Sequence, residues 1–193
     1  MFKTAAAIKL AASGAAIGAA ILAGTAHAGF VTAPPSLTQS GPGCSQSASS
    51  QVCGNLFTAA GPMVPGGPAL SRTVTLAYSG SAASTEAGLY LQGFQSRTAD
   101  SAATCSAADP ASKLDLTISE GGSTLYQGSL SDFAAAHSDP AGRLALAGAT
   151  GRPDTFNPGD RVDVSLAIGL DRSAGNEFMG CLSTTDFVWF AEQ

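Results

Sequence analysis

The sequence predicts an all-β protein, a jelly-roll or immunoglobulin-like β-sandwich with one short helix. Three observations support this fold class. Several segments alternate apolar and polar residues with a period of two, which is typical of strands with one buried face. Turns rich in Gly and Pro separate these segments. One stretch alone has the cap and spacing of a helix, so the strands must pack mainly on one another.

Residues 1–28 are expected to be a secretory signal peptide. Lys3 and Lys9 precede an apolar run from Leu10 to about Gly24, and the small-x-small triplet Ala26-His27-Ala28 follows. The run is shorter than the ~20 apolar residues of a bilayer span, which disfavours the alternative of an uncleaved anchor. We therefore expect cleavage after Ala28, a secreted protein at the cell surface or outside the cell, and no membrane span after cleavage.

Residues 29–55 are expected to be an amino-terminal tail rich in Ser, Pro and Gly, with a small cysteine loop. Phe30 and Val31 are a large apolar pair near its start, and Pro34-Pro35 excludes a central strand at that point. The sandwich domain itself is expected over residues 56–193.

The strands of that domain are predicted where the period of two is clear. The expected segments are SRTVTLAYS (71–79), LYLQGF (89–94), KLDLTIS (113–119) and RVDVSLAIGL (161–170). Gly121-Gly122 predicts a hairpin after the third of them, since glycine tolerates positive φ. Asn157-Pro158-Gly159-Asp160 suits a type II turn before the fourth.

One short helix is predicted in SLSDFAAAH (129–137). Ser129 is the expected N-cap, with Asp132 three residues later as its capping-box partner. Asp139-Pro140 is expected to end the helix.

The carboxyl-terminal segment STTDFVWFAEQ is apolar on both faces of an extended chain. Phe187 and Trp189 point one way, and Val188 and Phe190 the other. Such a strand is either central and covered on each side, or covered by another molecule. We expect it to be a core strand that closes the sheet.

The four cysteines are predicted to form two disulfides, because an exported chain meets an oxidising environment. Three pairings exist, and the sequence does not choose among them. We favour Cys44–Cys53 as the small loop and Cys105–Cys181 as a long-range link. A zinc site is the rival interpretation, but no Cys-x-x-Cys spacing occurs.

Charge excludes some classes of partner. The whole chain has a net charge of −5, and removal of Lys3 and Lys9 with the signal would leave −7. A basic footprint for nucleic acid or anionic membrane is therefore not expected.

The segment GDRVDVSLAIGLDRSAGNEFMGCLSTTDFVWFAEQ (159–193) resembles the carboxyl-terminal signature of the TasA/camelysin family of secreted bacterial biofilm-matrix and surface proteins. The matching positions are Asn176, Phe178 and Gly180, followed by the aromatic strand Phe187 to Gln193 with Trp189 and Phe190. Two further segments resemble the family more weakly, PGGPALSRTVTLAYSGS and SEGGSTLYQGSLSDFAA. The cysteines and the Ser-rich tail depart from the best-known members.

The resemblance implies an exported sandwich with a structural role at the cell surface or in an extracellular matrix. In fibre-forming members, an amino-terminal segment of one subunit completes the sheet of the next. Phe30 and Val31 would anchor such a donor strand, and the partner would be another copy or another matrix or surface protein. A disordered leader over residues 29–43 is the plainer alternative for the same segment. A monomeric surface module for binding or adhesion is the alternative function.

Some family members are labelled metalloendopeptidases, but the residues do not favour that activity here. Zinc hydrolysis needs about three protein ligands. His137 is the one histidine after the expected signal, and no His-Glu-x-x-His occurs. We therefore predict no enzyme activity, no catalytic or metal-ligating residues and no cofactor. A calcium site is the weaker alternative, with Asp154, Asp160 and Asp163 near the turn at 157–160 as its candidate ligands.

Asn176-x-Phe178-x-Gly180 is predicted to be structural. Asn suits a turn, Phe178 would enter the core, and Gly180 would permit a bend before the last strand.

Overall fold

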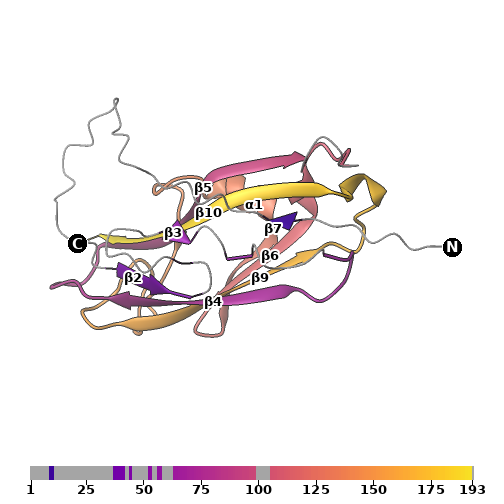
Figure 1. Cartoon of the computed structure of the whole chain (residues 1–193). Coiled ribbons are helices and arrows are strands. Elements are labelled where there is room, and N and C mark those ends of the chain that lie inside the picture. The colour runs from indigo at the N-terminus through magenta and orange to yellow at the C-terminus, as the bar shows by residue number, and fades with distance from the viewer. Residues whose placement is uncertain are drawn as a thin grey trace, which may run out of the picture.

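The computed structural model is a β-sandwich of two mainly antiparallel sheets with one short α-helix (Figure 1). The structure describes residues 9–10, 37–41, 44, 52–53, 56–57, 63–98 and 105–192. Its elements are β1 (Lys9–Leu10), β2 (Leu37–Ser40), β3 (Val52–Cys53), β4 (Leu70–Tyr78), β5 (Glu86–Thr98), η1 (Pro110–Lys113), β6 (Leu114–Glu120), β7 (Ser123–Ser129), α1 (Leu130–Ala136), β8 (Leu144–Ala145), β9 (Arg161–Leu170), η2 (Asn176–Phe178) and β10 (Cys181–Glu192).

The first sheet has the order β1-β10-β5-β8, and β3 also pairs with β10. The second sheet has the order β2-β4-β9-β6-β7. The β1–β10 pair is parallel, and the other strand pairs are antiparallel. Strands distant in sequence therefore lie side by side, with β10 in one layer and β9 in the other (Figure 1).

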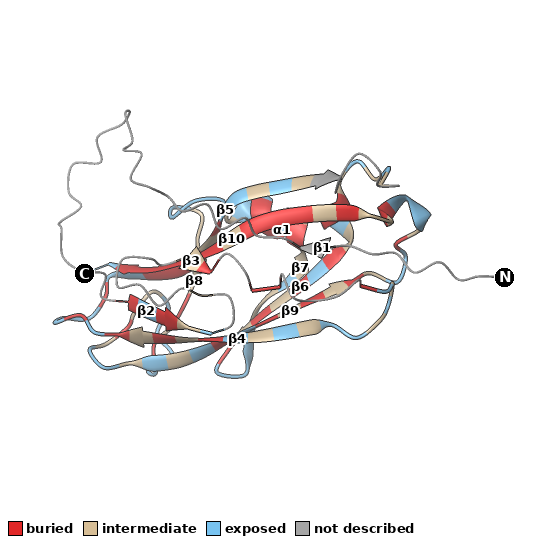
Figure 2. Cartoon of the chain, viewed as in Figure 1, coloured by how far each residue is buried: buried red, intermediate tan, exposed pale blue. Residues whose placement is uncertain are grey.

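The core lies between the two sheets, where the period of two places it. Val164, Leu166 and Ile168 of β9 are fully buried, and their sequence neighbours Asp163 and Ser165 are exposed. Figure 2 shows the same alternation along β4 and β9, while β10 is buried almost throughout. Alternation on one sheet and near-continuous burial on β10 are what the sequence predicts.

The predicted turns and helix are confirmed. Gly121 and Gly122 have φ of 55° and 87° in the β6–β7 hairpin. Gly159 has φ of 88°, and the Asp160 N–H donates to the Asn157 carbonyl at 2.9 Å, as a type II turn requires.

Helix α1 begins at the predicted cap. The Ser129 hydroxyl accepts a hydrogen bond from the Asp132 N–H at 3.0 Å and donates one to the Asp132 carboxylate at 2.7 Å. The helix ends at Ala136, three residues before Asp139, with His137 as its C-cap.

β5 extends beyond the predicted segment 89–94 at both ends, and a bulge interrupts its alternation. Gly93 has φ of 64°, and the register against β10 shifts between Thr184 and Asp186. The strand continues beyond the bulge to Thr98, so β10 has a partner along its whole length.

Part of the segment expected as a tail belongs to the sandwich. β2 pairs with β4, and β3 pairs with β10. Leu37 and Cys53 are buried core residues. Among the described residues, no helix is long and apolar enough to span a membrane.

Candidate assembly site

The centre of the candidate site is β10, which has one fully paired edge and one partly paired edge. On the first edge, β5 pairs with it from Cys181 to Glu192. On the second edge, β3 pairs with Phe187 and Val188, and β1 pairs with Leu182 and Ser183. Within the part of the chain that the structure describes, the rest of this second edge has no strand beside it.

The side chains of β10 occupy both faces of the first sheet, as the sequence predicts. Trp189 is 0 % exposed and Phe187 is 2 % exposed, and both belong to the core between the sheets. Phe57 packs against Phe187 edge to face, with ring centroids 6.3 Å apart. The indole N–H of Trp189 has no hydrogen-bond partner among the described residues.

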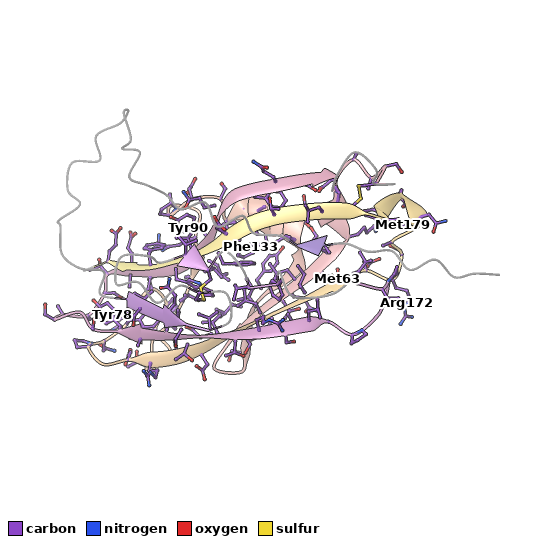
Figure 3. All side chains as sticks on the ribbon, viewed as in Figure 1. Met63, Tyr78, Tyr90, Phe133, Arg172 and Met179 are labelled. Atoms are coloured by element: carbon purple, nitrogen blue, oxygen red, sulfur yellow. A yellow bond between two sulfur atoms is a disulfide. The ribbon has the colours of Figure 1, made fainter. Side chains whose placement is uncertain are left out.

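The opposite face of β10 is covered by an aromatic and basic cluster. Phe190 meets Tyr90 edge to face at 5.9 Å, and the Arg143 guanidinium lies 5.8 Å from the Phe190 ring centroid. Burial raises the pKa of the Tyr90 phenol, and the nearby charge of Asp139 raises it further. Tyr90 and the core residue Phe133 are labelled in Figure 3.

Arg143 is held over Phe190 by two carboxylates. Its Nε donates a hydrogen bond to Asp154 Oδ1 at 3.1 Å, its Nη2 lies 3.1 Å from the same oxygen, and its Nη1 lies 3.5 Å from Glu86 Oε2. Sequence analysis did not identify this clamp, because Arg143 lies in a loop with no periodic pattern. The sequence shows only that position 88 is a glycine. In the structure, a Cβ at that position would lie 2.7 Å from the aliphatic part of the Arg143 side chain.

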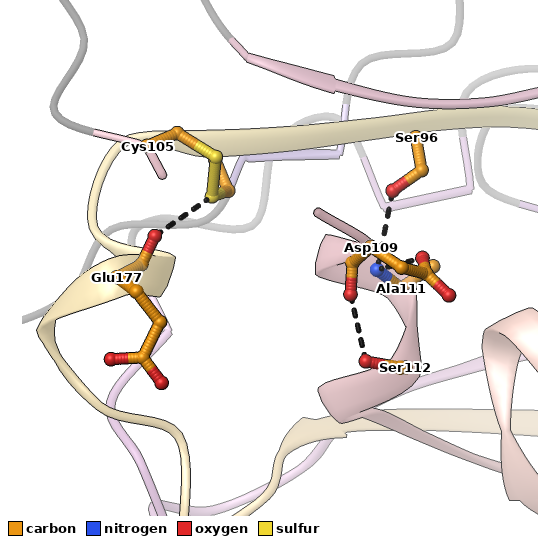
Figure 4. The surroundings of a disulfide bond; sticks show 7 residues. Ser96, Cys105, Asp109, Ala111, Ser112 and Glu177 are labelled. Atoms are coloured by element: carbon orange, nitrogen blue, oxygen red, sulfur yellow. Dashed lines mark hydrogen bonds between the residues drawn. A yellow bond between two sulfur atoms is a disulfide. The ribbon is translucent and has the colours of Figure 1, made fainter. Parts of the chain in front are cut away.

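The two disulfides are the pairs that the sequence analysis favours. Cys105–Cys181 links the segment after β5 to the start of β10 across 76 residues (Figure 4). Cys44–Cys53 spans nine residues and ties the turn after β2 to β3. Because β2 belongs to the second sheet and β3 to the first, this small loop joins the edges of the two sheets.

The Asn176-x-Phe178-x-Gly180 motif has a structural role. Asn176 and Phe178 bound η2, Phe178 is buried in the core, and Gly180 has φ of 69°. The Glu177 carbonyl accepts the N–H groups of Ser106 and Ala107 at 2.9 and 3.0 Å. The motif therefore turns the chain into β10 and holds the Cys105 segment beside it.

The predicted donor residues Phe30 and Val31 lie outside the described residues. The structure therefore describes a candidate acceptor edge on β10, whereas the donor remains a prediction.

The three aspartates considered for calcium do not converge. Asp154 is paired with Arg143, and Asp163 accepts from the Thr75 hydroxyl at 2.6 Å. Asp160 accepts the N–H groups of Ala149 and Asn157 at 3.2 and 2.8 Å. The described residues contain no group of three His, Cys, Asp or Glu side chains placed to hold a metal ion.

His137 caps the helix rather than joining other polar side chains. Its Nδ1 lies 2.5 Å from the Gly142 carbonyl, and its ring packs on Phe133 at 4.5 Å. Its own carbonyl accepts the Leu91 N–H at 2.8 Å, so it fastens the helix end to β5.

Comparison with protein-family models gives no match for this chain, and comparison with curated proteins gives none either. The resemblance to the TasA/camelysin family therefore stays a prediction from the residues that carry it.

Proposed function

We propose that this chain is a secreted structural protein of the cell surface or extracellular matrix, and that its copies assemble into fibres by strand donation. The observation that carries the proposal is the second edge of β10. A strand edge with unpaired N–H and C=O groups accepts an added strand through backbone hydrogen bonds. The two disulfides fit an extracellular setting.

The way β1 lies on this edge supports the proposal. Lys9 and Leu10 pair in parallel with Leu182 and Ser183, so an amino-terminal segment fits beside β10. Both residues belong to the segment expected to be removed as a signal peptide. After removal, that part of the edge would be open to a segment from another copy.

The test is a deletion of residues 29–33 from the secreted chain. Without Phe30 and Val31 we expect a folded monomer that no longer forms fibres by electron microscopy and light scattering. A sharper variant combines Phe30→Asp with Val31→Asp. Its matched control combines Thr32→Asp with Ala33→Asp, which adds the same charge but keeps Phe30 and Val31.

If the variant with Asp in place of Phe30 and Val31 forms fibres as fast as the control variant does, strand donation by this segment is ruled out. Monomers of the unaltered protein across pH and calcium concentration would instead favour the alternative, a monomeric module for binding or adhesion.

The prediction that the chain is not an enzyme has its own assay. Casein cleavage by purified protein that is lost with a chelator and regained with zinc would establish the metalloendopeptidase alternative.

A further inference from the structure

β3 is a short strand that blocks part of the second edge of β10. Its residues Val52 and Cys53 pair antiparallel with Val188 and Phe187, and Figure 1 shows β3 beside β10. A pairing of so few residues is too short to hold itself in place in water. The position of β3 must therefore be fixed by contacts elsewhere in the molecule.

The first of these contacts is the Cys44–Cys53 disulfide. Cys44 lies in the turn after β2, where its N–H donates to the Gly41 carbonyl at 3.2 Å, so the bond ties β3 to the edge of the second sheet. Cys53 is 0 % exposed and lies opposite Phe187. A strand that is linked covalently at this point cannot leave β10 unless β2 moves or the bond breaks.

The residues that follow β3 hold it as well. The Leu56 carbonyl accepts a hydrogen bond from Arg72 Nε of β4 at 3.0 Å. Phe57 is buried and packs edge to face on Phe187, with ring centroids 6.3 Å apart. β3 is therefore fastened to strands of both sheets and resists displacement by an incoming strand.

The part of the edge before this block, Leu182 to Asp186, is here called the open acceptor. It is five residues long. β1 pairs in parallel with its first two residues, and no other described strand lies beside it on this edge. Removal of residues 1–28 as the expected signal peptide would uncover all of it. Ser183, Thr184 and Thr185 have short buried side chains, which suits larger side chains on an added strand.

The expected donor has the same length and ends at the same place. Residues 29–33 are five residues, and Pro34-Pro35 follows them. If Val31 pairs with Ser183, in the parallel register that β1 shows, the first proline lies opposite Asp186. Proline has no N–H for the ladder, so pairing of the donor ends where β3 begins.

We propose that β3, fastened by the Cys44–Cys53 disulfide, is a stop that limits the open acceptor to a five-residue donor, and that this donor is residues 29–33 of another copy. The stop sets the register of donation, because a longer strand, or one shifted toward the end of β10, would meet β3. A shift by one residue would also turn the donor's side chains to the wrong faces. This role of β3 rests on strand donation as the proposed function and adds what selects the length and position of the donor.

The test measures the binding of donor peptides to the secreted chain that carries Phe30→Asp and Val31→Asp, which keeps the acceptor and inactivates the chain's own donor. Fluorescently labelled peptides are compared by anisotropy. The native peptide has the sequence of residues 29–36, and the extended peptide has the same length but carries Pro34→Thr and Pro35→Val. A third peptide with Phe30→Asp and Val31→Asp is the control for specificity.

The native and extended peptides should bind this acceptor with affinities within about twofold of each other, because β3 denies the extended peptide further backbone hydrogen bonds. In an acceptor that also carries Cys44→Ser and Cys53→Val, the extended peptide can displace β3. It should then bind about tenfold more tightly than the native peptide, because about two further hydrogen bonds form. Circular dichroism establishes that this variant keeps its fold.

Tighter binding of the extended peptide to the acceptor with its disulfide intact would overturn the proposal. Equal binding of the two peptides to the acceptor without the disulfide would overturn it too.

Amide hydrogen exchange of the disulfide-intact acceptor tests the stop without a cysteine variant. The native peptide should slow exchange within Leu182–Asp186 and leave Phe187 and Val188 unchanged, since β3 already covers them. Slower exchange at Phe187 or Val188 would show that the donor displaces β3, and would contradict the stop.

The outcomes distinguish the stop from the proposed function. Specific binding of the native peptide together with displacement of β3 would refute the stop and leave strand donation standing. Failure of the native peptide to bind any of these acceptors would contradict strand donation at this edge, and the stop with it.

Discussion

At the scale of single residues, Arg143 joins an aromatic ring to two carboxylates. Its stem crosses Gly88, its guanidinium covers Phe190, and its charge meets Asp154 and Glu86. Both carboxylates are partly exposed, so solvent screens the ion pairs and packing supplies much of the effect.

We expect Arg143→Ala to lower the free energy of unfolding by about 1–2 kcal/mol, through lost cover of Phe190 and two carboxylates left without a cation. Urea denaturation measures it. Arg161→Ala, at an exposed site, is the control and should change the value by less than about 0.5 kcal/mol. Equal effects of the two variants would show that the clamp contributes nothing.

Glu120 gives the fold a pH dependence of its own. Burial raises the pKa of its carboxyl in the folded state, and the hydrogen bond from Ala147 only partly opposes this. The folded state therefore binds a proton more readily than the unfolded state, and this site costs stability as the pH rises through the window between the two pKa values.

Glu120→Gln removes that titration. We expect the free energy of unfolding of the unaltered protein, relative to Glu120→Gln, to increase as the pH falls from 7 toward the ordinary carboxyl range. Urea denaturation of both proteins at several pH values measures this difference, and a difference that is constant with pH would contradict the assignment.

At the scale of elements, the two disulfides constrain different strands and close loops of different length. Cys105–Cys181 closes a long loop and fixes the start of β10, whereas Cys44–Cys53 closes a short loop and holds the two-residue strand β3. The chain-entropy model gives about 4.5 kcal/mol for the long loop and about 2.5 kcal/mol for the short one.

Replacing Cys105 and Cys181 with Ala should therefore destabilise the protein more than replacing Cys44 and Cys53. Chemical denaturation of the two double variants compares them. A greater loss from the short loop would mean that β3 and its contacts with β10 contribute more to stability than the loop entropy does.

Some elements could be predicted from the sequence because their residues show a clear local pattern. β9 occupies the predicted residues 161–170, because five apolar side chains at a period of two leave one arrangement that buries them. The hairpin at Gly121-Gly122 and the Ser129 cap depend on local chemistry, which a sequence displays directly.

Other elements leave no local signal. β2 and β3 contain four and two residues, too few to show a period, and their burial depends on distant partners. The bulge at Gly93 breaks the alternation of β5, so its second half was not predicted. The loop of residues 147–153 was not predicted because its supports come from Glu120, Asp160 and Arg143, which converge only in the fold.

At the scale of the whole molecule, the two sheets share one core, and Trp189 lies fully buried in it. The chain contains a single Trp, so indole fluorescence reports on this core alone. Far-ultraviolet circular dichroism reports on all the strands together.

We expect the two signals to change in one coincident transition during denaturation, because separating the sheets exposes Trp189 as the strands come apart. The fluorescence should start at short wavelength and shift to the red. An indole signal that changes well before the circular dichroism would mean that β10 detaches while the second sheet stays folded.

The close crossing of Arg143 over Gly88 also constrains how this protein can evolve. A methyl group at position 88 would meet the Arg143 stem at 2.7–2.9 Å and the Leu144 carbonyl at 2.9 Å. A descendant that gains a side chain at 88 must therefore displace the Arg143 side chain and shift the backbone at 144, and a displaced Arg143 no longer covers Phe190. Positions 88, 143 and 190 should consequently be inherited together, and a lineage that changes one of them is expected to have changed the others.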